Sequence, residues 1–173
     1  ELGFVHIVPR GLDHILFVLG LFLLGTGTRP LLWQVSAFTV AHATTLSLAV
    51  FEVVALPARV VEPLIALSIV YVAVENILTD RLTPWRPAVV FGFGLLHGLG
   101  FAGVLGQLGL PEQERIVGLV SFNVGIELGQ LLVIAVALAL VGWCRHRPWY
   151  RARVTVPVSL AIAGVGLFWA VGR

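Results

Sequence analysis

Six long runs of mostly apolar residues constrain this chain more than any other feature of its sequence. A helix needs about 20 such residues to cross the hydrocarbon core of a bilayer. Proline lies in or beside most of the breaks between the runs, as at Pro30, Pro57 and Pro148, where it favours a turn. The sequence therefore predicts an all-α polytopic membrane helix bundle with six transmembrane helices, at about residues 3–24, 31–56, 60–78, 88–108, 115–143 and 154–171.

Composition excludes most soluble classes of protein. Hydrophobic residues make up 58% of the 173 residues and charged residues only 12%, whereas soluble domains carry about 25% charged residues. These polar groups are too few to cover the surface of a soluble fold. Because the linkers are short, we expect antiparallel neighbouring helices and a single transmembrane domain over residues 1–173. The net charge of +2 is too small to indicate a nucleic-acid partner.

The arginines predict how the bundle lies in the membrane. Cytoplasmic loops of membrane proteins carry an excess of basic residues. The loops after the first, third and fifth helices hold seven arginines, and the opposite side holds four. This count places both termini on the extracytoplasmic side of the bacterial cytoplasmic (inner) membrane. Because the chain starts at Glu1 rather than at methionine, we expect a processed product or an excised domain.

Seven ionisable side chains interrupt the apolar runs. Such a group costs roughly 2.5–3.5 kcal/mol at the centre of a membrane helix, so it is tolerated where it faces a cavity, the bundle interior or another polar group. All seven are histidines or carboxylates, which favours a functional polar core over interhelical hydrogen bonding alone. They are His6, Asp13, His14, His42, Glu75, His97 and Glu127.

The first three of these residues fall near the predicted external surface. In a continuous helix, seven residues bring His6 and Asp13 to one face, and His14 lies about a quarter turn away. Pro9 can begin the regular helix there or kink it. Imidazole beside a carboxylate is a ligand set for zinc, nickel, cobalt or iron. The alternative interpretation is a polar cluster at the membrane surface with no ligand.

His42 and His97 lie near the middle of their helices, and with Glu127 they would form a second station for a metal ion. Stripes of small residues beside them predict close helix packing. We expect the helices over 88–108 and 115–143 to form the tight pair, unless the glycines serve packing alone. The stripes are Gly94, Gly98, Ala102 and Gly106 on the first helix and Gly125 and Gly129 on the second. Further polar residues of the predicted pathway are Glu75, Asn76, Asn123 and Gln130.

Four segments of the chain together resemble the HupE/UreJ family of membrane proteins. The first is fairly specific, because a glycine stands two residues before an Asp-His pair. The others are weak one by one and gain force from their order. The segments are Gly3-Phe-Val-His6-Ile-Val-Pro-Arg-Gly11-Leu-Asp13-His14-Ile-Leu-Phe17, Ala37-Phe-Thr-Val-Ala-His42, Gly94-Leu-Leu-His97-Gly-Leu-Gly-Phe-Ala and Phe122-Asn-Val-Gly-Ile-Glu127-Leu-Gly-Gln.

The resemblance runs from about Gly3 to Gln130 by motif and onward by hydropathy. Members of the family are regarded as nickel or cobalt permeases linked to hydrogenase and urease metallocentres. Ile7 follows the first histidine where hydrogenase-linked members typically have proline, so the chain matches a divergent branch often attached to an extracytoplasmic N-terminal region. By resemblance, the metal-handling residues are His6, Asp13, His14, His42 and His97.

Transport of a divalent transition-metal ion, nickel or cobalt before zinc, is therefore the leading hypothesis, and we predict no catalytic residue. The absence of methionine and the single Cys144 argue against a copper(I) path, which favours sulfur ligands. One alternative is an intramembrane zinc-dependent hydrolase that uses the same His/Asp cluster. Another is haem binding by His42 and His97 as axial ligands. The glycine-rich faces would also suit a homo-oligomer.

Overall fold

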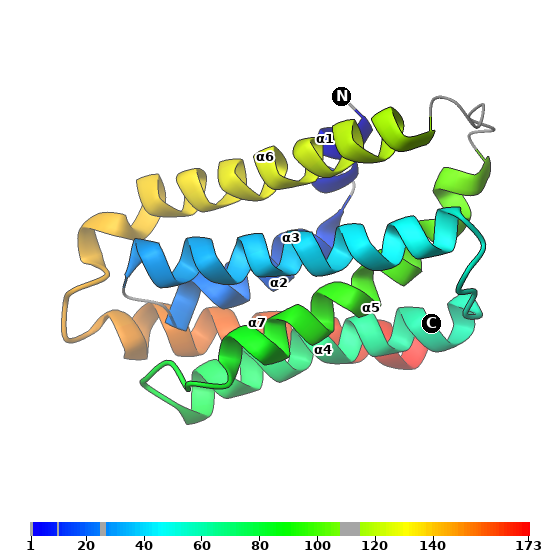
Figure 1. Cartoon of the computed structure of the whole chain (residues 1–173). Coiled ribbons are helices and arrows are strands. Elements are labelled where there is room, and N and C mark those ends of the chain that lie inside the picture. The colour runs from blue at the N-terminus through cyan, green and yellow to red at the C-terminus, as the bar shows by residue number, and fades with distance from the viewer. Residues whose placement is uncertain (1, 10, 25–26, 108–114) are drawn as a thin grey trace.

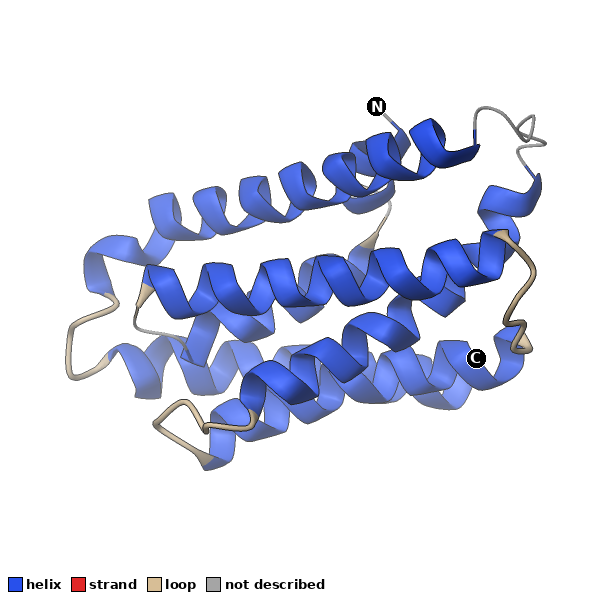
Figure 2. Cartoon of the chain, in the orientation of Figure 1, coloured by secondary structure: helices blue, strands red, loops and turns tan. Residues whose placement is uncertain are grey.

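The structure, a computed structural model, describes residues 2–9, 11–24, 27–107 and 115–173, with the backbone alone for residues 101–107. Every regular element in these residues is helical, as predicted, and none is a strand (Figure 2). A 3₁₀ turn, η2 (Gly142–Cys144), follows α6, and a π-helical turn, η3 (Arg151–Thr155), leads into α7. The α-helices are α1 (Leu2–Ile7), α2 (Leu12–Leu24), α3 (Thr28–Val50), α4 (Ala58–Leu78), α5 (Arg86–Gln107), α6 (Arg115–Val141) and α7 (Val156–Gly172).

The longer helices lie along one common direction, and the short α1 packs beside α6 (Figure 1). The chain passes from α3 to α4 at one end of the bundle, and from α4 to α5 and from α6 to α7 at the other end. The C-terminus lies at the first end (Figure 1). The arginine-bearing loops after α4 and α6 therefore share an end of the bundle, as antiparallel helices with short linkers require.

The first predicted helix, over 3–24, is not continuous. Helix α1 ends two residues before Pro9, and α2 begins at Leu12. Proline has no N–H to donate, and its ring disfavours helical backbone at the preceding residue, so α1 does not continue through it. His6 and His14 consequently stand on two separate helices.

The second predicted helix, over 31–56, is also shorter than expected, because α3 ends in a closed cap. Glu52 has a φ of 57°, in the left-handed region. Its N–H donates to the carbonyl of Ala49 at 3.1 Å, and the N–H of Val53 donates to the carbonyl of Leu48 at 2.8 Å. These two bonds satisfy carbonyls that the last turn of a helix leaves open, in the Schellman arrangement.

The glycines of α5 pack against α3. A Cβ on Gly94 would lie 2.6 Å from the carbonyl oxygen of Phe38, and one on Gly98 would overlap the carbonyl oxygen of His42. The hydroxyl of Thr45 on α3 donates to the carbonyl of Leu95 on α5 at 2.7 Å. The backbones of these two helices are therefore as close as small residues allow.

The glycines of α6 pack against α1. A Cβ on Gly125 would lie 2.7 Å from the backbone nitrogen of Phe4, and one on Gly129 would lie 2.7 Å from the Cβ of Ile7. The prediction that 88–108 and 115–143 form the tight pair is thus wrong for the residues described, since each stripe faces another helix. A small-residue stripe indicates that a helix approaches closely but does not specify which one. Two further residues of the first stripe, Ala102 and Gly106, lie outside the residues whose side chains are described.

Three helices in the described residues are long and apolar enough to cross a membrane: Ala58–Leu78, Arg115–Cys144 and Arg151–Gly172. Helix α3 has the length but also carries polar side chains, among them Gln34, Thr39 and His42, which lower its hydropathy. Exposed apolar residues such as Trp33 and Phe168 cover the outside of the bundle. The all-helical class is therefore present, with three clear spans by length and composition.

Candidate functional site

Four of the five histidines meet inside the bundle, although they come from four different helices. We call His6 of α1, His14 of α2, His42 of α3 and His97 of α5 the histidine cluster. The ring of His14 is central: its centroid lies 4.9 Å from that of His6, 5.4 Å from that of His42 and 5.0 Å from that of His97. The side chains of His14, His42 and His97 are buried. The fold thus gathers the histidines that the sequence analysis selected.

Ser68 of α4 fixes the tautomer of His97. The Ser68 hydroxyl donates its one hydrogen to the carbonyl of Ile65 at 2.6 Å. Its oxygen lies 3.0 Å from Nε2 of His97 and must therefore accept from that nitrogen. The proton of a neutral His97 is then on Nε2, and Nδ1 carries the lone pair that a metal ion requires.

Several ring nitrogens of the cluster have no hydrogen-bond partner among the residues described. They are buried, and they comprise Nε2 of His14, both nitrogens of His42 and Nδ1 of His97. Phenylalanine rings close the space around them: the centroid of Phe38 lies 5.0 Å from that of His97, and the centroid of Phe17 lies 5.2 Å from it. A buried polar atom without a partner costs about 1–3 kcal/mol, so a folded protein keeps several such atoms together for a reason other than stability.

The cluster is not a finished metal site. Within the part of the chain that is described, no group of three or more His, Cys, Asp or Glu side chains has an arrangement that would hold a metal ion. The rings of His6, His42 and His97 each stand edge-on to that of His14, at 71–78°. Ligation of an ion by these side chains therefore requires them to rearrange from the positions described.

A cavity of about 470 Å³ leads to three of the four histidines, and Asp13 stands in its wall. Both carboxylate oxygens of Asp13 accept hydrogen bonds from the guanidinium of Arg173, at 2.9 and 3.1 Å. This bidentate pair is only partly buried. The hydrogen bonds that Arg173 donates to Asp13 raise the pKa of Arg173. Asp13 therefore faces a cation at the mouth of the cavity. His42 does not line this cavity and lies deeper.

The polar stripe of α6 faces α3 rather than the histidines. Ser36 donates to Oε1 of Glu127 at 3.1 Å, and Thr39 donates to Oε1 of Gln130 at 3.0 Å. Asn123 donates to a carbonyl of its own helix. His97 and Glu127 thus contact different partners, in contrast to the expectation that one close helix pair would hold both in place.

Glu75 and Asn76 belong to a second buried polar cluster, near the end of the bundle where α4 leads into α5. The guanidinium of Arg86 is 2% exposed and donates to Glu75 at 2.8 Å, to Gln34 at 3.0 Å and to Asn76 at 3.3 Å. We call Gln34, Glu75, Asn76 and Arg86 the Arg86 cluster. The amide of Asn76 in turn donates to the carbonyl of Gly20 on α2 at 2.8 Å.

Sequence reasoning missed the partners in both clusters. It counted Arg86 and Arg173 only as loop arginines that report orientation, and it assigned no role to Gln34. A signal for Gln34 was present, because a glutamine stands alone in the apolar part of its helix. The position of Ser68 beside His97 depends on how α4 packs against α5, which no local pattern reveals.

Long apolar helices around buried histidines and a buried ion pair define the class of this molecule, a helical membrane protein with a polar interior. A profile of the HupE / UreJ protein family matches residues 1–173, the whole chain. The chain therefore belongs to the HupE/UreJ family, which confirms the resemblance seen in its sequence. Neither a curated protein nor a solved structure matches the chain. The family in general suggests nickel or cobalt transport.

Proposed function

We propose that this protein carries a divalent transition-metal ion, nickel or cobalt, across the bacterial cytoplasmic membrane. The family points to this class of substrate, and one observation supports it most directly. The rings of His42 and His97 both contact that of His14, and each of the three carries a buried nitrogen without a partner among the described residues. Neutral imidazole is a good ligand for these ions, and a buried group that costs stability is kept where function uses it.

The route begins in the cavity at the external end. There an incoming ion displaces the guanidinium of Arg173 from the carboxylate of Asp13, because both cations compete for the same oxygens. The ion then passes to His6, His14 and His97 as their rings rotate toward it. Nitrogen and carboxylate ligands bind strongly enough to replace water and weakly enough to release the ion.

In the proposed route the ion continues past His42 toward the Arg86 cluster, which lies at the end of the bundle where α4 leads into α5. His97 and Arg86 are eleven residues apart on α5, or about 16 Å at the rise of an α-helix. A buried guanidinium repels a divalent cation, so the ion leaves only when Arg86 moves from its partners. In this proposal both termini are extracytoplasmic, six helices cross the membrane, and Asn123, Glu127 and Gln130 belong to the polar pathway.

Uptake of metal into proteoliposomes tests the proposal. The full chain is reconstituted, and accumulation of Ni²⁺, Co²⁺ and Zn²⁺ is measured against protein-free vesicles. We expect His97→Ala and Asp13→Ala to reduce uptake by about tenfold or more, because loss of a ligand or its orienting partner weakens metal sites by that factor. His146→Ala is the matched control, since the fifth histidine lies exposed between η2 and η3. If none of the three ions accumulates above the protein-free level, the transport proposal is wrong.

A further inference from the structure

A small basic cavity lies at the end of the bundle where α6 leads into α7. Its volume is about 120 Å³, and its floor is formed by the apolar residues Leu23 and Leu24. We call it the arginine cavity, because Arg145, Arg147 and Arg151 line it together with Tyr150 and Asp80. It is separate from the cavity that contains the histidines.

Arg145 is a buried charged residue whose guanidinium is positioned by Phe22 of α2. Its side chain is buried, one Nη2 hydrogen is donated to the carbonyl of Phe22 at 3.2 Å, and the guanidinium lies 4.3 Å from the centroid of the Phe22 ring. Burial lowers the pKa of Arg145, but a guanidinium stays charged in proteins. A guanidinium has five N–H groups in a planar fork, a shape that matches the oxygens of a phosphate.

Tyr150 supplies a second donor to the cavity. Its side chain is only 6% exposed, and its hydroxyl faces the guanidinium of Arg145, from which its oxygen can accept a hydrogen bond. Burial raises the pKa of Tyr150, so the hydroxyl keeps its proton and can donate. Because the hydroxyl oxygen can accept from Arg145, its own hydrogen remains available for an anion in the cavity.

The remaining charged groups set the balance of the cavity. Arg151 has a structural role, because its guanidinium donates to the backbone carbonyls of Asn76, Ile77 and Thr79 at the end of α4. Arg147 is exposed at the rim. The carboxylate of Asp80 opposes an anion but is also exposed, and three guanidinium groups outweigh it.

We propose that the arginine cavity binds the phosphate group of an anionic membrane lipid. The cavity has room for about four water molecules at roughly 30 Å³ each, enough for a phosphate group with the rest of the lipid outside. Trp143 and Trp149 beside it are both exposed, as is typical of tryptophans at the membrane–water interface. Basic pockets of this kind on the cytoplasmic side bind anionic headgroups. This inference rests on the proposed orientation of the bundle but does not require metal transport.

Lipid titration of the purified full chain in neutral detergent tests the proposal. Three additives are compared: phosphatidylglycerol, phosphatidylcholine and inorganic phosphate. The thermal unfolding midpoint and the number of lipids retained in native mass spectra are measured. We expect phosphatidylglycerol to raise the midpoint by several degrees, because a ligand that binds only the folded state stabilises it. Phosphatidylcholine should raise it less, since its headgroup carries a compensating positive charge.

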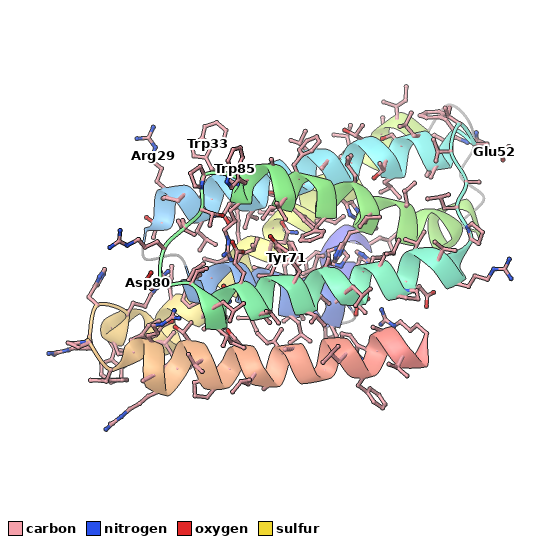
Figure 3. All side chains as sticks on the ribbon, turned by 90° about the horizontal axis from the view of Figure 1, so that it is seen from below. Arg29, Trp33, Glu52, Tyr71, Asp80 and Trp85 are labelled. Atoms are coloured by element: carbon pink, nitrogen blue, oxygen red, sulfur yellow. The ribbon has the colours of Figure 1, made fainter. Side chains whose placement is uncertain are left out.

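Three variants and one control locate the effect. Arg145→Gln and Arg147→Gln should each weaken phosphatidylglycerol binding by about tenfold, and Tyr150→Phe by a few-fold, through loss of charge-assisted or neutral hydrogen bonds. Tyr150→Phe keeps the packing of the ring, so it remains informative if Arg145→Gln fails to fold. Arg29→Gln is the matched control: Arg29 is exposed at the same end of the bundle as Asp80, and its side chain points away from the ribbon (Figure 3).

Two results would overturn the proposal. If Arg29→Gln weakens lipid binding as much as Arg147→Gln and Tyr150→Phe do, the lipid responds to the general charge of this end and not to the cavity. If inorganic phosphate protects as well as phosphatidylglycerol at equal concentration, the ligand is a soluble anion and not a lipid.

Discussion

The two buried polar clusters of this protein differ in how far their hydrogen bonds are satisfied. In the Arg86 cluster, the guanidinium donates to three side chains, Gln34 on α3 and Glu75 and Asn76 on α4. Thr83 donates to the remaining oxygen of Glu75 at 3.2 Å. In the histidine cluster, most contacts are between ring edges and faces, and Ser68 is the hydrogen-bond partner of His97. The polar groups around Arg86 are paired, whereas the histidine cluster keeps buried ring nitrogens without a partner among the described residues.

Because of this difference, substitutions in the two clusters should change the free energy of unfolding in different ways. A buried ion pair adds little to stability when it is intact, but removal of one partner leaves an uncompensated charge and is expensive. An unpartnered imidazole already costs stability in the folded state, so its replacement by an apolar side chain removes that cost. Substitutions in the Arg86 cluster should therefore lower the free energy of unfolding, and apolar substitutions in the histidine cluster should raise it.

The largest effect is expected at Arg86. Arg86→Ala should lower the free energy of unfolding by about 3–5 kcal/mol, because it leaves Glu75 buried without its partner. The measurement is equilibrium denaturation in detergent micelles. Arg81→Ala is the control, since Arg81 is exposed in the same loop and should change stability by less than about 0.5 kcal/mol. Equal losses for the two variants would contradict a structural role for the cluster.

The next effect concerns the helix contact beside the histidines. Gly98→Ala should lower the free energy of unfolding by about 1–2 kcal/mol. The new methyl group would overlap the backbone of α3, and the cost of this overlap exceeds the gain in helix propensity from glycine to alanine. Gly92→Ala on the same helix meets no atom within 4 Å and should gain up to about 1 kcal/mol. Thermal unfolding of both variants checks this pair. A Gly98→Ala protein as stable as Gly92→Ala would show that α3 and α5 do not pack as described.

The third effect has the opposite sign. His42→Leu should raise the free energy of unfolding by about 1 kcal/mol, since both ring nitrogens are buried without a partner among the described residues. Metal uptake by the same variant should fall. Denaturation and uptake are measured on one preparation, with His146→Leu as the control for both. Destabilisation by several kcal/mol would indicate that His42 is hydrogen-bonded in the folded protein.

The smallest effect on stability is expected at Asp13. Asp13→Asn should cost less than about 1 kcal/mol, because the pair with Arg173 is partly exposed and solvent screens it. Uptake should nevertheless fall by a larger factor than in Asp80→Asn, which changes an exposed carboxylate at the other end. The uptake rate and the unfolding midpoint are measured for both variants. A fall in uptake without a matching fall in the midpoint indicates that Asp13 contributes to ion binding rather than to stability.

Much of the fold and of the site follows from local patterns. Long apolar runs predict helices because a membrane leaves no other way to satisfy the backbone, and the described residues are helical throughout their regular elements. Histidines and carboxylates in apolar runs identified all four residues of the histidine cluster, but only Glu75 of the Arg86 cluster. The break before α2 and the cap of α3 were harder to place, since the hydropathy of the sequence continues through them while Pro9 and Glu52 end the helices.

The sequence by itself determined the helical class, the family and the histidines of the cluster as candidates, because these depend on residue type and on spacing along one chain. Only the tertiary structure decided which residues meet. It joined Ser68 to His97, Arg86 to Glu75 and Gln34, and Arg173 to Asp13, and it placed the glycines of α5 on α3. Each of these contacts links segments whose approach depends on the packing of whole helices. Helical periodicity specifies the face a side chain occupies, but not the helix that covers that face.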